Sequence, residues 1–225
     1  MNMFEAKNVE IKINGLSLFQ SISFSVLPGE VVAIMGPSGS GKSSLLSYIA
    51  GSLTRPLMGS GPILIEGRDI SSLLIEKRKV GILYQDDLLF PHMTVGENLL
   101  FSLNNSGSRK LRILEIETAL SKVGLKDFFK RRPASLSGGQ RARASLLRTF
   151  LSKPKLILLD EPFSKLDKAL RANFREFVYD QLIALRVPSV LVTHNPEDIP
   201  PGAKVIFLES VFKSEVEQGR SKDHK

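Results

Sequence analysis

The chain has 225 residues, 42% apolar and 24% charged, proportions that fit one large globular domain or a core with a subdomain. It has no cysteine, which excludes disulfides and thiolate chemistry, and no apolar run approaches the ~18 residues that cross a bilayer. The first residues lack the basic and apolar segments of a signal peptide, so none is expected. The net charge of +8, with basic clusters at 77–79, 130–132, 141 and 143, leaves three interpretations open: a solvated surface, attraction to an anionic membrane, or attraction to nucleic acid.

The first third of the sequence predicts strands with one helix among them. Residues 4–28 alternate apolar and polar side chains, which predicts antiparallel strands around a turn at Asn14-Gly15. A helix is expected over Ser43–Ala50, ending at Gly51. Short apolar runs predict further strands, at Val31–Met35, Ile63–Glu66 and Val80–Tyr84.

The pattern is mainly helical from Thr94 to Phe150, with breaks expected at Asn104–Ser108 and at Pro133. Strands alternate with a helix again in the last third, where the helix is expected over Leu166–Leu185. The strands are expected at Lys155–Asp160, Ser189–Thr193 and Val205–Leu208. This alternation predicts an α/β fold with a mostly parallel sheet covered on both faces, and a polar tail over 214–225 that is expected to be disordered.

Residues 36–43 read G-P-S-G-S-G-K-S and match the phosphate-binding P-loop, G-x-x-x-x-G-K-[ST]. The loop separates an apolar strand run from a helical run, so its backbone N–H groups are expected to meet an anion at a helix N-terminus. In such a loop Lys42 supplies charge for the terminal phosphates, and the Ser43 hydroxyl is a ligand for Mg²⁺. The alternative is an ordinary glycine-rich turn, against which the full match and its flanks argue.

An apolar run ends in two carboxylates, Asp160 and Glu161. Ligands of an open parallel sheet gather at the carboxyl ends of its strands, and an aspartate there beside a P-loop holds Mg²⁺. Because successive side chains leave a strand in opposite directions, Asp160 is expected on the metal side, and Glu161 is expected to accept a proton from an attacking water. A pair of solvated carboxylates is the alternative.

Two further positions have both a structural and a functional interpretation. Ser137 precedes the helical run Arg141–Leu151. It is expected either simply to cap that helix or to form, with the glycines after it, a second helix N-terminus that binds an anion. His194 follows a predicted strand, where a lone histidine is more often structural, but where it can also face a γ-phosphate.

These motifs, in this order, resemble the ATP-binding subunit of an ABC transporter. The run Leu-Ser-Gly-Gly-Gln at 136–140, shortly before Asp160-Glu161, is specific to ABC ATPases, and the resemblance extends from Phe4 to Leu208. It implies a single ABC ATPase domain over 1–213 with a P-loop NTPase (RecA-like) core at 1–90 and 152–213, N-terminal antiparallel strands, and an inserted helical subdomain at about 91–151.

The resemblance also implies a role for each motif residue. ATP is bound by Gly36, Pro37, Ser38, Gly39, Ser40, Gly41, Lys42, Ser43 and Ser44, and across the subunit interface by Ser137, Gly138, Gly139 and Gln140. Mg²⁺ is held at Ser43, Gln85 and Asp160. The catalytic groups are the general base Glu161, the switch histidine His194, the sensor Gln85, and Lys42.

The sequence departs from the family pattern at three places. Ile13 stands where an aromatic residue usually stacks on adenine, and Phe19 is the nearest aromatic. Lys165 replaces the usual small residue of the D-loop, Ser164 to Asp167, a change expected to alter subunit contacts. Asn195 stands where an acidic residue commonly follows the histidine.

The resemblance further implies partners: a second copy of the chain in a head-to-tail homodimer, transmembrane permease subunits, and a substrate-binding protein, at the cytoplasmic face of the inner (plasma) membrane. Residues 85–92 and 94–98 resemble those of bacterial importers, and a groove near Gln85–Phe90, with apolar Leu88, Leu89 and Phe90, is expected to grip a permease helix. Those three residues can instead be core.

Two other functions remain open from the sequence. A soluble ABC-type ATPase acting on nucleic acid or the ribosome is the main alternative, although no nucleic acid is expected as a partner. A P-loop kinase is the third function class.

Overall fold

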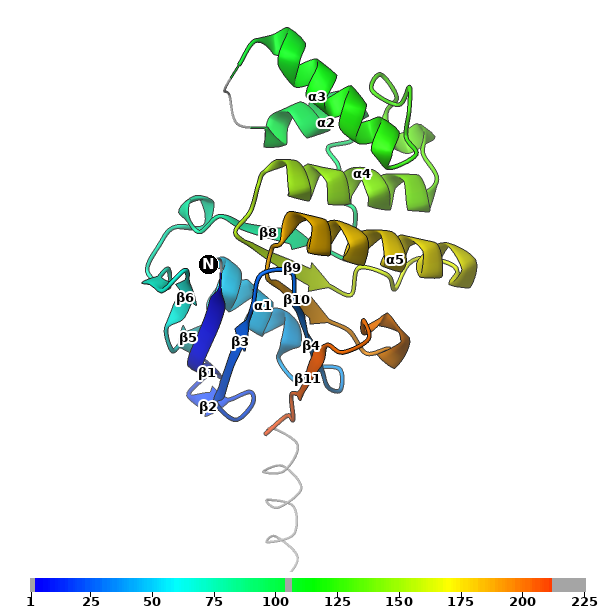
Figure 1. The fold of residues 1–225 in the computed structure, drawn as a ribbon. Helices are drawn as coiled ribbons and strands as arrows, with labels where there is room; N and C mark the ends of the chain where they lie inside the picture. The colour runs from blue at the N-terminus through cyan, green and yellow to red at the C-terminus, as the bar shows by residue number, and fades with distance from the viewer. Residues whose placement is uncertain (1–2, 104–106, 212–225) are drawn as a thin grey trace, which may run out of the picture. The chain divides into compact units, whose positions relative to one another are not determined.

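A computed structural model describes residues 3–103 and 107–211. The described residues divide into two compact units (Figure 1). The first takes its residues from Met1–Val80, Lys155–Asp160 and Leu182–Lys225, and the second from Gly81–Pro154 and Glu161–Gln181. The subdomain boundaries expected from the sequence stay a prediction, and the expected disordered tail lies outside the described residues.

The antiparallel sheet of the first unit is built around β1 (Phe4–Ile13). Asn14 and Gly15 both have positive φ, which turns the chain directly from β1 into its partner β2 and confirms the predicted hairpin. The order is β2-β1-β6-β7, and β3 and β5 also pair with β1. The strands are β2 (Leu16–Ser17), β3 (Ile22–Val26), β5 (Leu57–Ser60), β6 (Ile63–Ile65) and β7 (Arg68–Asp69).

The parallel sheet of the first unit carries the P-loop. Its strands run in the order β11-β4-β10-β9, and every residue of β10 is buried, as expected of a sheet covered on both faces. After β4 the chain enters the helix α1 (Lys42–Ala50), which ends at Gly51 in the left-handed conformation, as predicted. The strands are β4 (Val31–Met35), β9 (Leu156–Asp160), β10 (Ser189–Val192) and β11 (Lys204–Phe207).

The second unit is mainly helical and begins within β8 (Val80–Leu83). Its helices α2, α3 and α4 contact one another around a buried apolar core that includes Leu99, Ile116 and Leu147. None of the described helices is both long and apolar enough to span a membrane. The helices are α2 (Val95–Ser102), α3 (Arg109–Lys122), α4 (Gly138–Leu151) and α5 (Lys168–Leu185), the last crossing into the first unit.

Candidate nucleotide-binding site

Glycine shapes the P-loop that follows β4. Gly36 has φ +150, and a Cβ on it would lie 2.4 Å from the carbonyl oxygen of Leu208, so a larger residue does not fit. Gly41 has φ +93, and a Cβ there would lie 2.9 Å from the ring of Phe19, which is fully buried. The two glycines therefore let the backbone pass close to its neighbours and turn directly into α1.

Lys42 is the first residue of α1, and its side chain returns to the loop. Its Nζ donates hydrogen bonds to the carbonyl oxygens of Gly36 and Pro37, at 2.8 and 2.7 Å. Among the described residues no side chain caps this end of α1, and its first turn has no acidic residue. The Lys42 ammonium and the positive end of the helix dipole thus lie at the same loop, which has the electrostatics of a phosphate site.

Ser43 and Asp160 meet at the end of the P-loop. Ser43 lies in the first turn of α1, Asp160 ends β9, and the Ser43 Oγ donates to Asp160 Oδ1 at 3.3 Å. A hydroxyl and a carboxylate at this spacing fit Mg²⁺, which takes one or two protein oxygens and completes its shell with water and phosphate. Elsewhere in the described ranges no group of three or more His, Cys, Asp or Glu side chains could hold a metal.

Glu161 follows Asp160 at a sharp turn of the backbone. Its φ is +47, which is uncommon for a residue other than glycine. Its carbonyl oxygen accepts hydrogen bonds from the backbone N–H of Ser164 at 3.2 Å and from the Ser164 Oγ at 2.8 Å. The D-loop serine therefore holds the turn at which Glu161 leaves the strand direction.

His194 lies at the same end of the parallel sheet as the P-loop and Asp160. Val192, the last residue of β10, is aligned with Ile34 on β4 and with Asp160 on β9. His194 comes two residues later and is exposed. The carboxyl end of these strands therefore brings together the P-loop, the Ser43–Asp160 pair and the histidine within the first unit.

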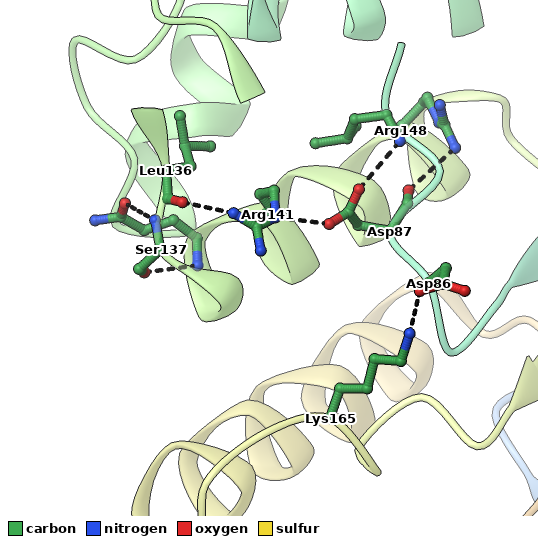
Figure 2. A network of polar contacts seen from close by, with 9 residues as sticks. Asp86, Asp87, Leu136, Ser137, Arg141, Arg148 and Lys165 are labelled. Atoms are coloured by element: carbon green, nitrogen blue, oxygen red, sulfur yellow. Dashed lines mark hydrogen bonds and ion pairs between the residues drawn. The ribbon is translucent and has the colours of Figure 1, made fainter. Parts of the chain in front are cut away.

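In the second unit, Ser137 caps α4. The Ser137 Oγ accepts from the backbone N–H of Gln140 at 3.3 Å, and the Gln140 Oε1 accepts from the backbone N–H of Ser137 at 2.9 Å, a reciprocal capping box (Figure 2). Apart from its chain neighbours and the backbone of its own helix, a Cβ on Gly138 would have no described heavy atom within 4 Å, so the helix start is open on that side. The capping interpretation is confirmed, and the open side leaves room for an anion as well.

The segment around Gln85 lies beside two other motifs of the second unit, the start of α4 and the D-loop. Gln85 is exposed and lines a cavity of about 280 Å³ together with Gly138 of α4 and Leu166 of the D-loop. Ion pairs join these elements (Figure 2), because Asp86 pairs with Lys165, and Arg141 Nε donates to Asp87 Oδ2 at 2.8 Å. The sequence identified Lys165 as a departure in the D-loop but did not reveal Asp86 as its partner.

The expected apolar cluster divides between core and surface. Leu89 belongs to the buried core of the second unit, whereas Leu88 is 53% exposed. Phe90 packs edge-to-face on Phe101 with ring centroids 5.4 Å apart, and Phe101 is 70% exposed. Phe101 could not be identified from the sequence, because an aromatic residue in a helix is ordinarily part of the core, and only the fold shows that this one is exposed.

Ile13, the residue expected at the place of the adenine-stacking aromatic, lies at the end of a strand beside another aliphatic side chain. Ile13 ends β1, partly buried, with Leu16 beside it 48% exposed. Phe19, the nearest aromatic in the sequence, is buried against Gly41 and has no free face for a base. The end of β1 therefore carries aliphatic side chains, and the only aromatic that the sequence offered nearby, Phe19, is part of the core.

One residue of the basic cluster at 77–79, Arg78, has a structural role. Arg78 is 6% exposed, and its guanidinium donates to the carbonyl oxygens of Tyr48 and Ile49 at the end of α1, at 2.8 and 2.9 Å, and to that of Leu73 at 2.9 Å. Burial lowers the pKa of Arg78 from its usual value. A cation at the C-terminal end of a helix complements the dipole, so this member of the 77–79 cluster stabilises α1 instead of facing a partner.

Comparison with known proteins agrees with this geometry. The family model described as ABC transporter matches residues 19–164. The uncharacterized ABC transporter ATP-binding protein YnjD of Escherichia coli is 43% identical over 206 residues, covering 92% of this chain and 95% of the relative. The Fe(3+) ions import ATP-binding protein FbpC 3 of Rhodococcus jostii is 40% identical over 91% of this chain, and the putrescine transport ATP-binding protein PotG of Escherichia coli is 38% identical over 87%.

The chain spans 59% of the length of that iron import protein and 52% of that putrescine transport protein, so only part of each is matched. The family match covers more than half of the chain, and it includes the P-loop, the Ser137 helix start and the Asp160-Glu161 strand end. The chain therefore belongs to the ABC transporter family, as an ATP-binding subunit that hydrolyses ATP.

Proposed function

We propose that this chain powers a bacterial importer as a pair of identical subunits bound to a membrane permease and supplied by a substrate-binding protein. The observation that carries the nucleotide chemistry is the Ser43–Asp160 contact at 3.3 Å beside the P-loop. Relatives named for iron, putrescine and sulfate or thiosulfate import support the direction of transport. A peripheral position at the cytoplasmic face of the inner membrane is part of the same proposal.

In this mechanism the chain binds the phosphates, orients water and moves one proton. The P-loop N–H groups and Lys42 bind the phosphates of ATP. Ser43 and Asp160 would hold Mg²⁺, which would neutralise charge on the phosphates. Glu161 accepts a proton from the attacking water, and His194 contacts the γ-phosphate. Gln85 senses the magnesium ion and the water.

The second copy completes each site. The start of α4 is open beside Gly138, and its first turn carries no acidic residue, so it can receive the γ-phosphate of ATP held on the partner's P-loop. In a two-fold pair each chain gives this helix start to the other, and ATP closes the dimer until hydrolysis releases it.

The exposed apolar residues of the second unit are the proposed permease contact. Leu88, Phe90 and Phe101 form this docking surface: Leu88 and Phe101 are exposed, and Phe90 is held by the edge-to-face contact with Phe101. A short apolar helix of a membrane protein has the chemistry to fit such a surface.

The test is purification of the native complex from membranes, followed by identification of its subunits. A permease with several transmembrane helices and a substrate-binding protein are the expected partners. Recovery of ribosomal proteins or nucleic acid, with binding that weakens steeply as salt rises, would instead support the alternative of a soluble ATPase acting on nucleic acid.

A further inference from the structure

His194 is flanked in sequence by two buried polar residues, a threonine directly before it and an aspartate four positions after it. Thr193 and Asp198 are each 1% exposed, and the Thr193 Oγ1 donates a hydrogen bond to Asp198 Oδ2 at 2.9 Å. His194, between them in sequence, is exposed. Both residues belong to the first unit, on the turn that follows β10.

The same hydroxyl fixes the backbone on the far side of the histidine. The backbone N–H of Asn195 donates to Thr193 Oγ1 at 3.1 Å, and the N–H of Asp198 donates to the Asn195 carbonyl oxygen at 3.0 Å. Asn195 in turn caps the short 3-10 turn η3 (Pro196–Asp198), because its Oδ1 accepts from the N–H of Glu197 at 3.0 Å. The chain therefore closes into a turn with the Thr193 hydroxyl and the Asp198 carboxylate buried inside it.

On its other side, Thr193 is tied to the strand that leads into the P-loop. Its backbone N–H donates to the carbonyl oxygen of Ile34 on β4 at 3.3 Å. The residue thus continues the parallel register of β10 with β4, which aligns Val192 with Ile34. His194 is consequently held between a residue anchored to the sheet and a turn anchored to that residue.

The geometry points to Asp198 as a positioning residue for His194. An exposed histidine on an unrestrained loop would sample many orientations, whereas catalysis requires the group to be held in place before the reaction. The Asp198 carboxylate holds His194 indirectly. It accepts the hydrogen of the Thr193 hydroxyl, and this orients the hydroxyl oxygen to accept the hydrogen bond from the backbone N–H of Asn195, the residue after the histidine. This inference rests on the proposed contact of His194 with the γ-phosphate.

The test is a double-mutant cycle between Asp198→Ala and His194→Ala, read as kcat and KM for ATP, with the thermal midpoint measured for each variant. Asp198→Ala is expected to lower kcat by about 10- to 100-fold with KM changed less than about threefold, since small displacements of a catalytic group have effects of this size. In the His194→Ala background the same substitution is expected to lower kcat no further.

Three variants keep the test decisive if Asp198→Ala folds poorly. Thr193→Val keeps the side-chain shape and removes the hydroxyl, so it is expected to reproduce the loss of kcat, and Thr193→Ser is expected to restore it. Ser189→Ala removes another buried hydroxyl, which donates to the carbonyl oxygen of Val187 at the start of β10, and is expected to leave kcat unchanged.

Additive losses in the Asp198–His194 cycle would overturn the inference and leave the proposed function standing. A wild-type kcat in His194→Ala would show that the histidine takes no part in turnover, and this would overturn the inference as well. Equal loss of kcat in Thr193→Val and Ser189→Ala would also contradict it, because destabilisation alone would then explain the effect.

Discussion

The start of α4 offers a prediction with a control built into the same unit. Helices α2 and α4 both begin with a capping box: the Thr94 Oγ1 accepts from the N–H of Glu97 at 3.2 Å, as the Ser137 Oγ accepts from Gln140 at 3.3 Å. Replacing either cap by alanine is expected to cost about 1 kcal/mol, which lowers the thermal midpoint by about 2–4 °C for a chain of this size.

Only the Ser137 change is expected to affect turnover. If its hydroxyl also contacts the partner's γ-phosphate, losing one hydrogen bond to a charged group costs about 1.5–3 kcal/mol, or roughly 10- to 100-fold in ATPase rate. The assay is steady-state ATP hydrolysis by Ser137→Ala and Thr94→Ala, compared at temperatures well below both thermal midpoints. Equal rates in the two variants would show that Ser137 is a helix cap and nothing more.

The two capping boxes also differ in their response to pH. Hydrogen bonds from the backbone and side chain of Thr94 hold the pKa of Glu97 below its ordinary 4.5. This contribution to stability is present above the unfolded-state pKa and is lost as pH falls through the lower folded-state pKa. Alanine keeps the backbone N–H, so the part of the Thr94→Ala destabilisation that comes from the side chain is expected to shrink as pH falls below 4.5, whereas the destabilisation by Ser137→Ala persists because glutamine does not titrate.

Three further changes test other parts of the account. Glu161→Gln is expected to keep ATP affinity, lower turnover by about 10²–10⁴-fold and leave an ATP-bound dimer in size-exclusion chromatography; wild-type turnover would exclude Glu161 as the base. Phe90→Asp is expected to abolish co-purification with the permease while basal ATPase is kept, and Leu114→Asp, at an exposed position of α3, to change neither; permease retained by Phe90→Asp contradicts the docking surface. Arg78→Gln is expected to lower the thermal midpoint by several degrees, because hydrogen bonds from a charged group are worth about 1.5–3 kcal/mol; an unchanged midpoint would show that this contact does not stabilise α1.

Features with a local cause could be predicted from the sequence. The apolar run of β4, the glycine loop and the helix that ends at Gly51 each follow from the chemistry of consecutive residues. The turn at Asn14-Gly15 and the cap at Ser137 are local in the same sense, since each needs only the residues within one turn. The contact between Ser43 and Asp160 could be predicted as well, because parallel strands bring their carboxyl ends to one edge.

Contacts between distant residues that no strand alignment brings together could not be predicted in this way. Lys165 and Asp86 lie 79 positions apart, and nothing in either neighbourhood indicates that they pair. Arg78 sits in a run of three cations that is indistinguishable in sequence from a solvated surface, yet it is buried against the end of a helix 29 residues earlier. In both cases the tertiary fold decides whether a charge meets water, a carbonyl oxygen or an opposite charge.

The central claim is that each chain completes the other's reaction site, and complementation tests it most directly. Alone, Lys42→Ala is expected to be nearly inactive and Ser137→Ala to keep about a tenth of the wild-type rate or less, because both sites of either homodimer lack one required group. Mixed in equal amounts, they are expected to recover about a quarter of the wild-type ATPase rate, since half of the pairs are mixed and each mixed pair has one complete site. A mixture that stays as inactive as its components would contradict the claim.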